Sequence, residues 1–184
     1  MPELLLALAG NPGSGKTSIS NYVAARYGIP RVTGSEILLE WAGDLGIDLV
    51  SRTDYTNFHH RMSQERGTQA LIGAILERQG TKGLINDGLR VWSDSETFKS
   101  LGGKVIALWC PLNERLSRVS RLNDSKYRTD NADAFLADEV VAYNSSDPHG
   151  QHTLKVMGAA DYDIEANRPL EEVFAQIDAI IAQI

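Results

Sequence analysis

Residues 7–20 read ALAGNPGSGKTSIS, and this stretch is the strongest structural signal in the chain. The apolar run Leu4–Ala9 leads into it, and such runs are typical of buried parallel strands. Gly10–Thr17 then fits the pattern Gly-x4-Gly-Lys-[Ser/Thr], in which backbone N–H groups at the start of a helix surround an anion. The sequence therefore predicts a phosphate-binding loop between the first strand and the first helix.

The residue types in this loop suit a nucleoside triphosphate. Glycine lets the backbone approach the phosphates, the lysine ammonium reaches the β- and γ-phosphates, and the threonine hydroxyl is a ligand for Mg²⁺. We expect the nucleotide-binding residues here to be Asn11, Gly13, Ser14, Gly15, Lys16, Thr17 and Ser18. ATP and Mg²⁺ are the expected cofactors.

Strand and helix patterns alternate through the rest of the chain. The predicted strands are 4–9, 29–33, 83–87, 104–110 and 161–166, and the predicted helices are 15–27, one starting at 36, 61–80, 93–101, 111–122, 132–143, 147–158 and 169–181. In the helix at 147–158, Asp147 is the expected N-cap and Pro148 the first residue. The stretch 44–61 is polar, and residues 58–67 (FHHRMSQERG) are expected to be helical and to face the place where an acceptor would enter.

This alternation indicates an α/β fold in which a five-stranded parallel sheet lies between two layers of helices. The length of 184 residues suits a single domain over 1–184. In such sheets, ligands bind at the carboxyl ends of the strands.

Composition narrows the classes of partner. The net charge of −6 argues against a general nucleic-acid surface, and the N-terminal apolar run is too short for a membrane span or a signal segment. Cys110 is the single cysteine, so no intrachain disulfide is possible and the cytoplasm is the expected compartment. We expect a small-molecule partner, no nucleic acid, no membrane, and a monomer or homodimer.

Four segments carry a resemblance to a known family. They are GNPGSGKT (10–17), VTGSEILLE (32–40), NDGLR (86–90) and AADYDIEANRPLEE (159–172). On these segments the chain resembles the P-loop nucleoside-monophosphate kinases, a group that includes adenylate kinase and dephospho-CoA kinase. The resemblance implies the P-loop NTPase three-layer fold and an ATP-dependent phosphotransferase that acts on a nucleoside monophosphate or a related nucleotide.

The resemblance also implies residue roles. Thr17 and Asp87 would hold Mg²⁺, whereas a plain reading of Asp87 is a strand-end residue that caps the turn with Gly88. The implied acceptor-binding residues are Thr33, Gly34 and Arg90, the implied donor-binding residues are Arg118 and Asn167, and the implied catalytic residues are Lys16, Asp87, Arg90 and Arg121. The alternative to a role of Arg90 in binding the acceptor phosphate is that it is an ordinary surface residue.

Two segments would complete the site. The resemblance implies an acceptor-binding helical segment at about 34–80 and a short lid at about 122–133. The lid arginines would be Arg118, Arg121 and Arg128, although a solvated basic face is an equally good interpretation of any one of them.

The acceptor remains open because the motifs depart from those of both relatives. The Thr-Gly-Asp segment of adenylate kinases reads Thr33-Gly34-Ser35, and their Asp-Gly-Phe-Pro-Arg is shortened to Asp-Gly-Leu-Arg at 87–90. The Asp-x-Asp of bacterial dephospho-CoA kinases is absent. Two alternatives therefore stand: a dephospho-CoA or other small-alcohol kinase with Asp87 as the base, and a regulatory ATPase that acts on a protein partner.

Overall fold

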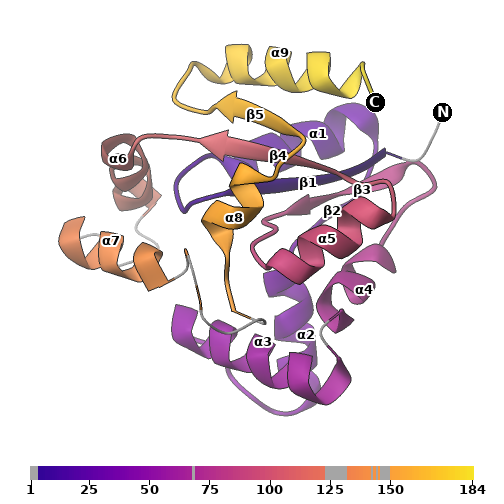
Figure 1. The fold of residues 1–184 in the computed structure, drawn as a ribbon, viewed down its shortest axis with the longest axis vertical. Coiled ribbons are helices and arrows are strands. Elements are labelled where there is room, and N and C mark those ends of the chain that lie inside the picture. Colours follow the sequence, from indigo (N-terminus) through magenta and orange to yellow (C-terminus); the bar gives the residue numbers. More distant parts are fainter. Residues whose placement is uncertain (1–3, 68, 123–131, 142, 144, 146–149) are drawn as a thin grey trace.

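The computed structural model describes residues 4–67, 69–122, 132–141, 143, 145 and 150–184. Within them, five parallel strands form one sheet in the order β2-β3-β1-β4-β5, with helices on both faces (Figure 1). The strands are β1 (Leu4–Gly10), β2 (Arg31–Val32), β3 (Gly83–Asp87), β4 (Lys104–Trp109) and β5 (Tyr162–Glu165). The predicted α/β fold with a five-stranded parallel sheet is confirmed.

The first strand lies at the centre of the sheet. β1 pairs with β3 on one side and β4 on the other, with Leu8 opposite both Asp87 and Ile106. Leu6 and Leu8 have no exposed surface because helices cover both faces of the sheet. This placement brings the loop after β1 next to Asp87, at the carboxyl end of β3.

The helices form the two outer layers. They are α1 (Lys16–Tyr27), α2 (Gly34–Asp44), α3 (Arg52–Arg66), α4 (Ala70–Leu76), α5 (Trp92–Ser100), α6 (Leu112–Leu122), α7 (Ala132–Val141), α8 (Thr153–Gly158) and α9 (Leu170–Ile181). Ile19 of α1 and Ile177 of α9 belong to the core on one face, whereas Ile37 of α2, Ile72 of α4 and Phe98 of α5 belong to the core on the other.

The structure departs from the prediction for residues 44–80 at two points. The helix expected at 58–67 is part of α3, which begins earlier, within the polar stretch 44–61, after a reciprocal capping box between Ser51 and Asp54. The single helix predicted over 61–80 is divided, because Gly67 adopts a φ of 95° and ends α3 before α4 begins. The start of α3 is hard to predict because its sequence is largely polar, and Phe58 and Met62 are its buried apolar residues.

The helix predicted over 147–158 is wrong at residues 150–152, which are not helical. Asp147 and Pro148 lie outside the described residues, and α8 begins only at Thr153. The amide of His152 donates instead to the carbonyl of Arg90 at 2.8 Å, which holds the non-helical residues 150–152 against the segment that follows β3. Among the described helices, none has both the length and the apolar character needed to cross a bilayer.

Candidate active site

The Gly10–Thr17 loop has the geometry of a phosphate cradle. Gly15 is the N-cap of α1 with a φ of 94°, and no side chain caps the helix, so its first N–H groups remain available to an anion. Gly13 has a φ of 77°, and a Cβ there would lie 2.5 Å from the carbonyl oxygen of Arg115. Glycine is therefore required where the loop passes under α6.

Two polar side chains of the loop fit a phosphate ligand. The Nζ of Lys16 donates to the carbonyls of Gly10 and Asn11, both at 2.9 Å, which holds the ammonium over the loop. The buried hydroxyl of Ser14 has no hydrogen-bond partner among the described residues. A lysine held by its own loop and an orphaned hydroxyl beside it are suited to triphosphate oxygens.

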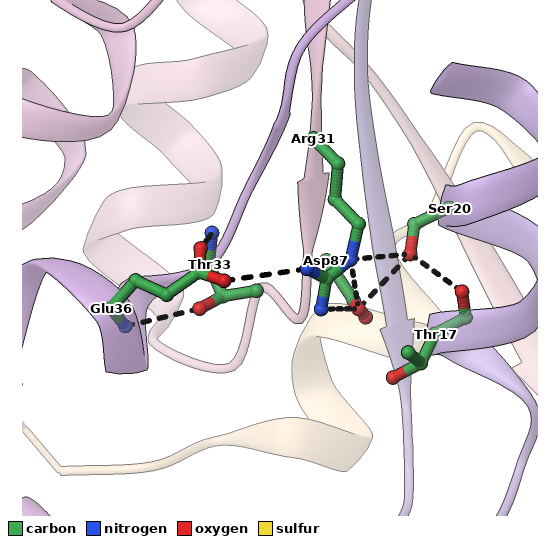
Figure 2. Close-up of polar contacts among 6 residues, drawn as sticks. All are labelled: Thr17, Ser20, Arg31, Thr33, Glu36 and Asp87. Carbon is green, nitrogen blue, oxygen red and sulfur yellow. Dashed lines mark hydrogen bonds and ion pairs between the residues drawn. The ribbon is translucent and has the colours of Figure 1, made fainter. Parts of the chain in front are cut away.

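Asp87 is held by a cluster at the carboxyl ends of β2 and β3. Figure 2 shows Arg31 and Ser20 converging on it: the Oδ2 of Asp87 lies 3.0 Å from Arg31 Nε, 2.8 Å from Arg31 Nη2 and 3.0 Å from Ser20 Oγ. Ser20 Oγ also lies 3.1 Å from the carbonyl of Thr17. Arg31 was not predicted from the sequence, because its partner is distant along the chain.

The predicted magnesium ligands are of a suitable type. The Thr17 hydroxyl is on an exposed residue beside the loop, and the hydrogen bonds to the Asp87 carboxylate all reach its Oδ2. The described residues contain no group of three or more His, Cys, Asp or Glu side chains arranged to hold a metal. Mg²⁺ usually keeps several waters and takes phosphate oxygens, so one hydroxyl and one carboxylate fit it.

Thr33 has a structural role at the start of α2. Its Oγ1 accepts from the Glu36 amide at 3.0 Å, and Glu36 Oε2 accepts from the Thr33 amide at 2.9 Å (Figure 2). This capping box orients α2, whose Gly34 lines the neighbouring pocket. Of the two residues predicted to bind an acceptor here, Gly34 is thus at the pocket and Thr33 positions the helix.

A pocket of about 210 Å³ lies beside the phosphate loop. One wall comes from the segment at 34–80 and includes Leu38, Tyr55, His59, Leu71 and Ile75. The opposite wall is formed by Asn86–Val91 with Asp94 and Gln151. A Cβ on Gly88 would lie 3.8 Å from the Cε of Lys16, so the pocket and the phosphate loop adjoin at this glycine.

Arg90 supplies an uncommitted positive charge to this pocket. Its residue lines the pocket, and within the described parts of the chain its guanidinium makes no hydrogen bond or ion pair. Its backbone is fixed, because the carbonyl accepts from the His152 amide at 2.8 Å. An anchored backbone with an unpaired guanidinium is suited to bind an anionic ligand bidentately.

The pocket also contains buried polar groups that were not predicted from the sequence. Asn86 is 1% exposed and Asp94 is 3% exposed, and the Oδ1 of each has no hydrogen-bond partner among the described residues. Burial raises the pKa of Asp94 to about 7. This burial could not be predicted from the sequence, because an acidic residue in the first turn of a helix ordinarily lies in solvent, where it interacts favourably with the helix dipole.

The predicted arginines of α6 have different surroundings. Arg118 reaches the phosphate loop: its Nη2 donates to the carbonyl of Ala166 at 2.9 Å, and its Nη1 lies 3.4 Å from the carbonyl oxygen of Gly13. Asn167 follows Ala166 and is exposed. Arg121 is exposed and donates to Ser117 of its own helix.

The remaining lid prediction is largely untested. Arg128 and the segment 123–131 lie outside the described residues. Arg115, on the same helix, is buried rather than free: it forms an ion pair with Glu139, and its Nε donates to the Cys110 carbonyl at 2.9 Å. The carboxylate of Glu139 also accepts from the Tyr143 hydroxyl at 2.8 Å, which links α7 to α6.

Comparison with known proteins decides the family. The AAA_17 family, an AAA domain, matches residues 9–135. The chain belongs to this family. The match spans the end of β1, the phosphate loop, α6 and the pocket-lining residues other than Gln151.

Relatives and solved structures are consistent with this assignment. The AAA_17 chain is 24% identical to a cytidylate kinase of Haloquadratum walsbyi, over 97% of this chain and 90% of that protein. It is 25% identical to a cytidylate kinase of Methanocaldococcus jannaschii over 64% of each protein. Its fold is similar to that of a shikimate kinase from Bacteroides thetaiotaomicron (TM-score 0.64, 14% identity, 97% and 98% covered).

A gluconokinase from Sinorhizobium meliloti has a similar fold as well (TM-score 0.59, 16% identity, 98% and 92% covered). At these identities the solved structures establish the fold alone. Family, relatives and fold together place the AAA_17 chain among the P-loop small-molecule kinases.

Proposed function

We propose that the protein transfers the γ-phosphoryl group of magnesium-bound ATP to a nucleoside monophosphate, with CMP as the first candidate. The observation that carries this proposal is the closeness of Gly88 to Lys16, where the phosphate loop adjoins a small pocket lined by Arg90, whose guanidinium has no partner among the described residues. The similarity to two cytidylate kinases supports a nucleotide as the acceptor.

The donor side of the site binds and neutralises phosphate. The loop amides and Lys16 hold the donor phosphates, and Arg118 lies where it can contact them or the attached nucleoside. Thr17 and Asp87 hold Mg²⁺, which offsets charge on the phosphates when it is bound. The exposed Asn167, next to the Arg118 contact at Ala166, would border the donor base.

The acceptor side orients a second anion toward the first. Arg90 binds the acceptor phosphate, and Gly34 forms part of the pocket wall without a side chain. A phosphate acceptor is already ionised at neutral pH, so the reaction needs positioning and charge neutralisation rather than a base. A lid at 122–133 with Arg121 and Arg128 is part of the same proposal and would exclude water.

The experiment measures ADP formation from Mg·ATP with each of CMP, UMP, AMP, GMP, dephospho-CoA, shikimate, gluconate and no acceptor. We expect CMP to stimulate ADP formation most. Stimulation by an alcohol alone would replace this proposal with an alcohol kinase, and an acceptor-independent rate would replace it with a regulatory ATPase.

Replacing Arg90 tests the acceptor side directly. Arg90→Ala should raise the KM for the acceptor at least tenfold, or about 1.4 kcal/mol, and change the KM for ATP less than twofold. Arg168→Ala is the matched control, because Arg168 is exposed and pairs only locally with Glu165. Equal increases in both KM values would remove Arg90 from the acceptor site.

A further inference from the structure

The inner wall of the pocket has an excess of hydrogen-bond acceptors. Asn86 Oδ1, Asp94 Oδ1 and Gln151 Oε1 are all buried, and none has a hydrogen-bond partner among the described residues. All three residues line the pocket. An unpaired buried acceptor is costly, so a ligand that brings a donor to this wall is favoured.

This wall and Arg90 line the same pocket. Arg90 precedes α5 and Asp94 is in its first turn, so a ligand phosphate at Arg90 would direct the rest of the molecule along the start of α5. Leu38 and Leu71 supply apolar surface opposite. Gly34 packs closely against Leu71 in this wall, because a Cβ on Gly34 would lie 3.3 Å from Leu71 Cδ2.

We propose that Asp94 is a specificity-determining residue that accepts a hydrogen bond from an exocyclic amino group of the acceptor base, so that the pocket selects a 4-aminopyrimidine over a 4-oxopyrimidine. This inference rests on the proposed nucleoside-monophosphate kinase activity. It extends that proposal by naming the residue and the atom of the base that set the preference.

The selectivity follows from the chemistry of the two groups. An ionised carboxylate only accepts hydrogen bonds, and a 4-amino group donates to it. A 4-oxo oxygen is itself an acceptor, so it would repel the carboxylate oxygen, and the buried oxygens of the wall would still have no donor. Sites built to pair a polar group discriminate strongly against an analogue that lacks it, because the buried partner is then left unsatisfied.

The test compares kcat/KM for CMP and UMP in the wild type, Asp94→Asn and Glu96→Gln. Assays are made at pH 8, above the pKa of about 7 of Asp94, so that the carboxyl group is largely ionised. Glu96 is an exposed acid on the same helix, so its substitution is the matched loss of charge. Each CMP-to-UMP ratio comes from one preparation, so any inactive protein cancels.

We expect the wild type to prefer CMP at least tenfold, and Asp94→Asn to lower that ratio at least tenfold, because an amide can rotate its NH₂ group toward a 4-oxo oxygen. Glu96→Gln should keep the wild-type ratio. A wild-type enzyme that uses both nucleotides equally would overturn the inference and leave the kinase proposal standing.

An unchanged CMP-to-UMP ratio in Asp94→Asn would also overturn the inference, because the buried oxygens of the wall would then bind water rather than the base. Failure of every nucleoside monophosphate in the wild-type panel would instead reject the proposed function itself. The wild-type ratio remains informative even if Asp94→Asn does not fold.

Discussion

Lys16 concentrates the positive charge of the phosphate loop in one side chain. It is 9% exposed, and its ammonium is held by loop carbonyls rather than buried in an apolar core. Its removal therefore opens no large cavity, and its main effect should be on the charge available to phosphate.

We predict that Lys16→Ala lowers the kcat of acceptor-stimulated ADP formation at least about a hundredfold, because the transition state loses a fixed charge. The melting temperature should change by no more than a few degrees. Steady-state kinetics and thermal unfolding on the same preparation check both statements. Transfer that persists within a fewfold of the wild type would reject the phosphate-loop interpretation.

Single residues differ in how far the sequence predicts them. Lys16 and Thr17 are set by a contiguous motif, which is a local pattern that can be recognised without any tertiary information. Arg31 and Asp94 were not predicted, since their environments arise only when distant segments meet. A pattern in sequence cannot reveal that a helix-start acid is buried, because burial depends on α3, α4 and the 150–152 segment around it.

At the scale of helices, buried polar contacts join α6 and α7 to each other and to the phosphate loop. Arg115 of α6 and Glu139 of α7 form an ion pair whose side chains are 5% and 1% exposed. Burial, and then the hydrogen bond to Glu139, raise the pKa of Tyr143 to about 12, so the hydroxyl stays protonated as a donor. Asn11 of the phosphate loop lies 3.4 Å from the same hydroxyl.

We predict that removing one partner of the Arg115–Glu139 pair destabilises the fold more, per substitution, than replacing both partners together. Glu139→Gln and Arg115→Met should each lower the free energy of unfolding by about 3–5 kcal/mol, because each leaves a buried partner uncompensated. The double variant should lose at least about 1 kcal/mol less than the sum of the two. Urea unfolding of the four proteins measures the coupling, and strictly additive losses would show that the two side chains act independently.

The last helix depends on a second polar contact, and it carries a pH signature. Asp178 of α9 accepts from the hydroxyls of Tyr22 and Tyr27 at 2.7 and 2.8 Å, and pairs with Arg26 at 3.0 Å. Desolvation alone would raise the pKa of Asp178, but these hydrogen bonds and the arginine outweigh it and lower the pKa.

We predict that Asp178→Asn lowers the free energy of unfolding by roughly 1 kcal/mol at pH 7. A lowered carboxyl pKa contributes stability above the unfolded value of about 4, so the difference from wild type should persist above that pH and shrink as the pH falls through the folded pKa. Urea midpoints between pH 7 and pH 3 test this. A difference that grows on acidification would contradict the sign, and Glu171→Gln is the control.

Elements were predicted where burial and sequence pattern agree. β1, α1 and α9 have apolar positions that match their buried faces, and all three were found in place. The first half of α3 was not predicted, because its sequence is largely polar and its helical state is set by the Ser51–Asp54 capping box and by packing on α2 and α4. The capping box was the one local signal that marked its start.

For the whole molecule, the sheet places both halves of the site on one edge. β1 delivers the phosphate loop, and β3 delivers Asp87 and the pocket wall, with the two strands paired side by side (Figure 1). The proposed donor and acceptor sites adjoin at Gly88, so we expect one long ligand to be able to occupy both.

We predict that cytidine and adenosine joined through five phosphates bind at least about a hundredfold more tightly than ATP or CMP alone, since the second contact becomes intramolecular. Calorimetry measures the three affinities. Lys16→Ala and Arg90→Ala should each weaken the linked compound. Affinity no better than that of ATP would mean that the two sites are not aligned for transfer.

The central position of β1 has a consequence for the order of events during synthesis. Leu4 pairs with Gly83, and Leu6 with Lys104, so the ribosome releases the apolar strand long before either neighbour exists. Parallel pairing between such distant segments closes slowly, and unpaired apolar strands are prone to aggregate. The nascent chain should thus be most dependent on chaperones until β4 has emerged, and a pause placed before that point would lower the yield of soluble protein.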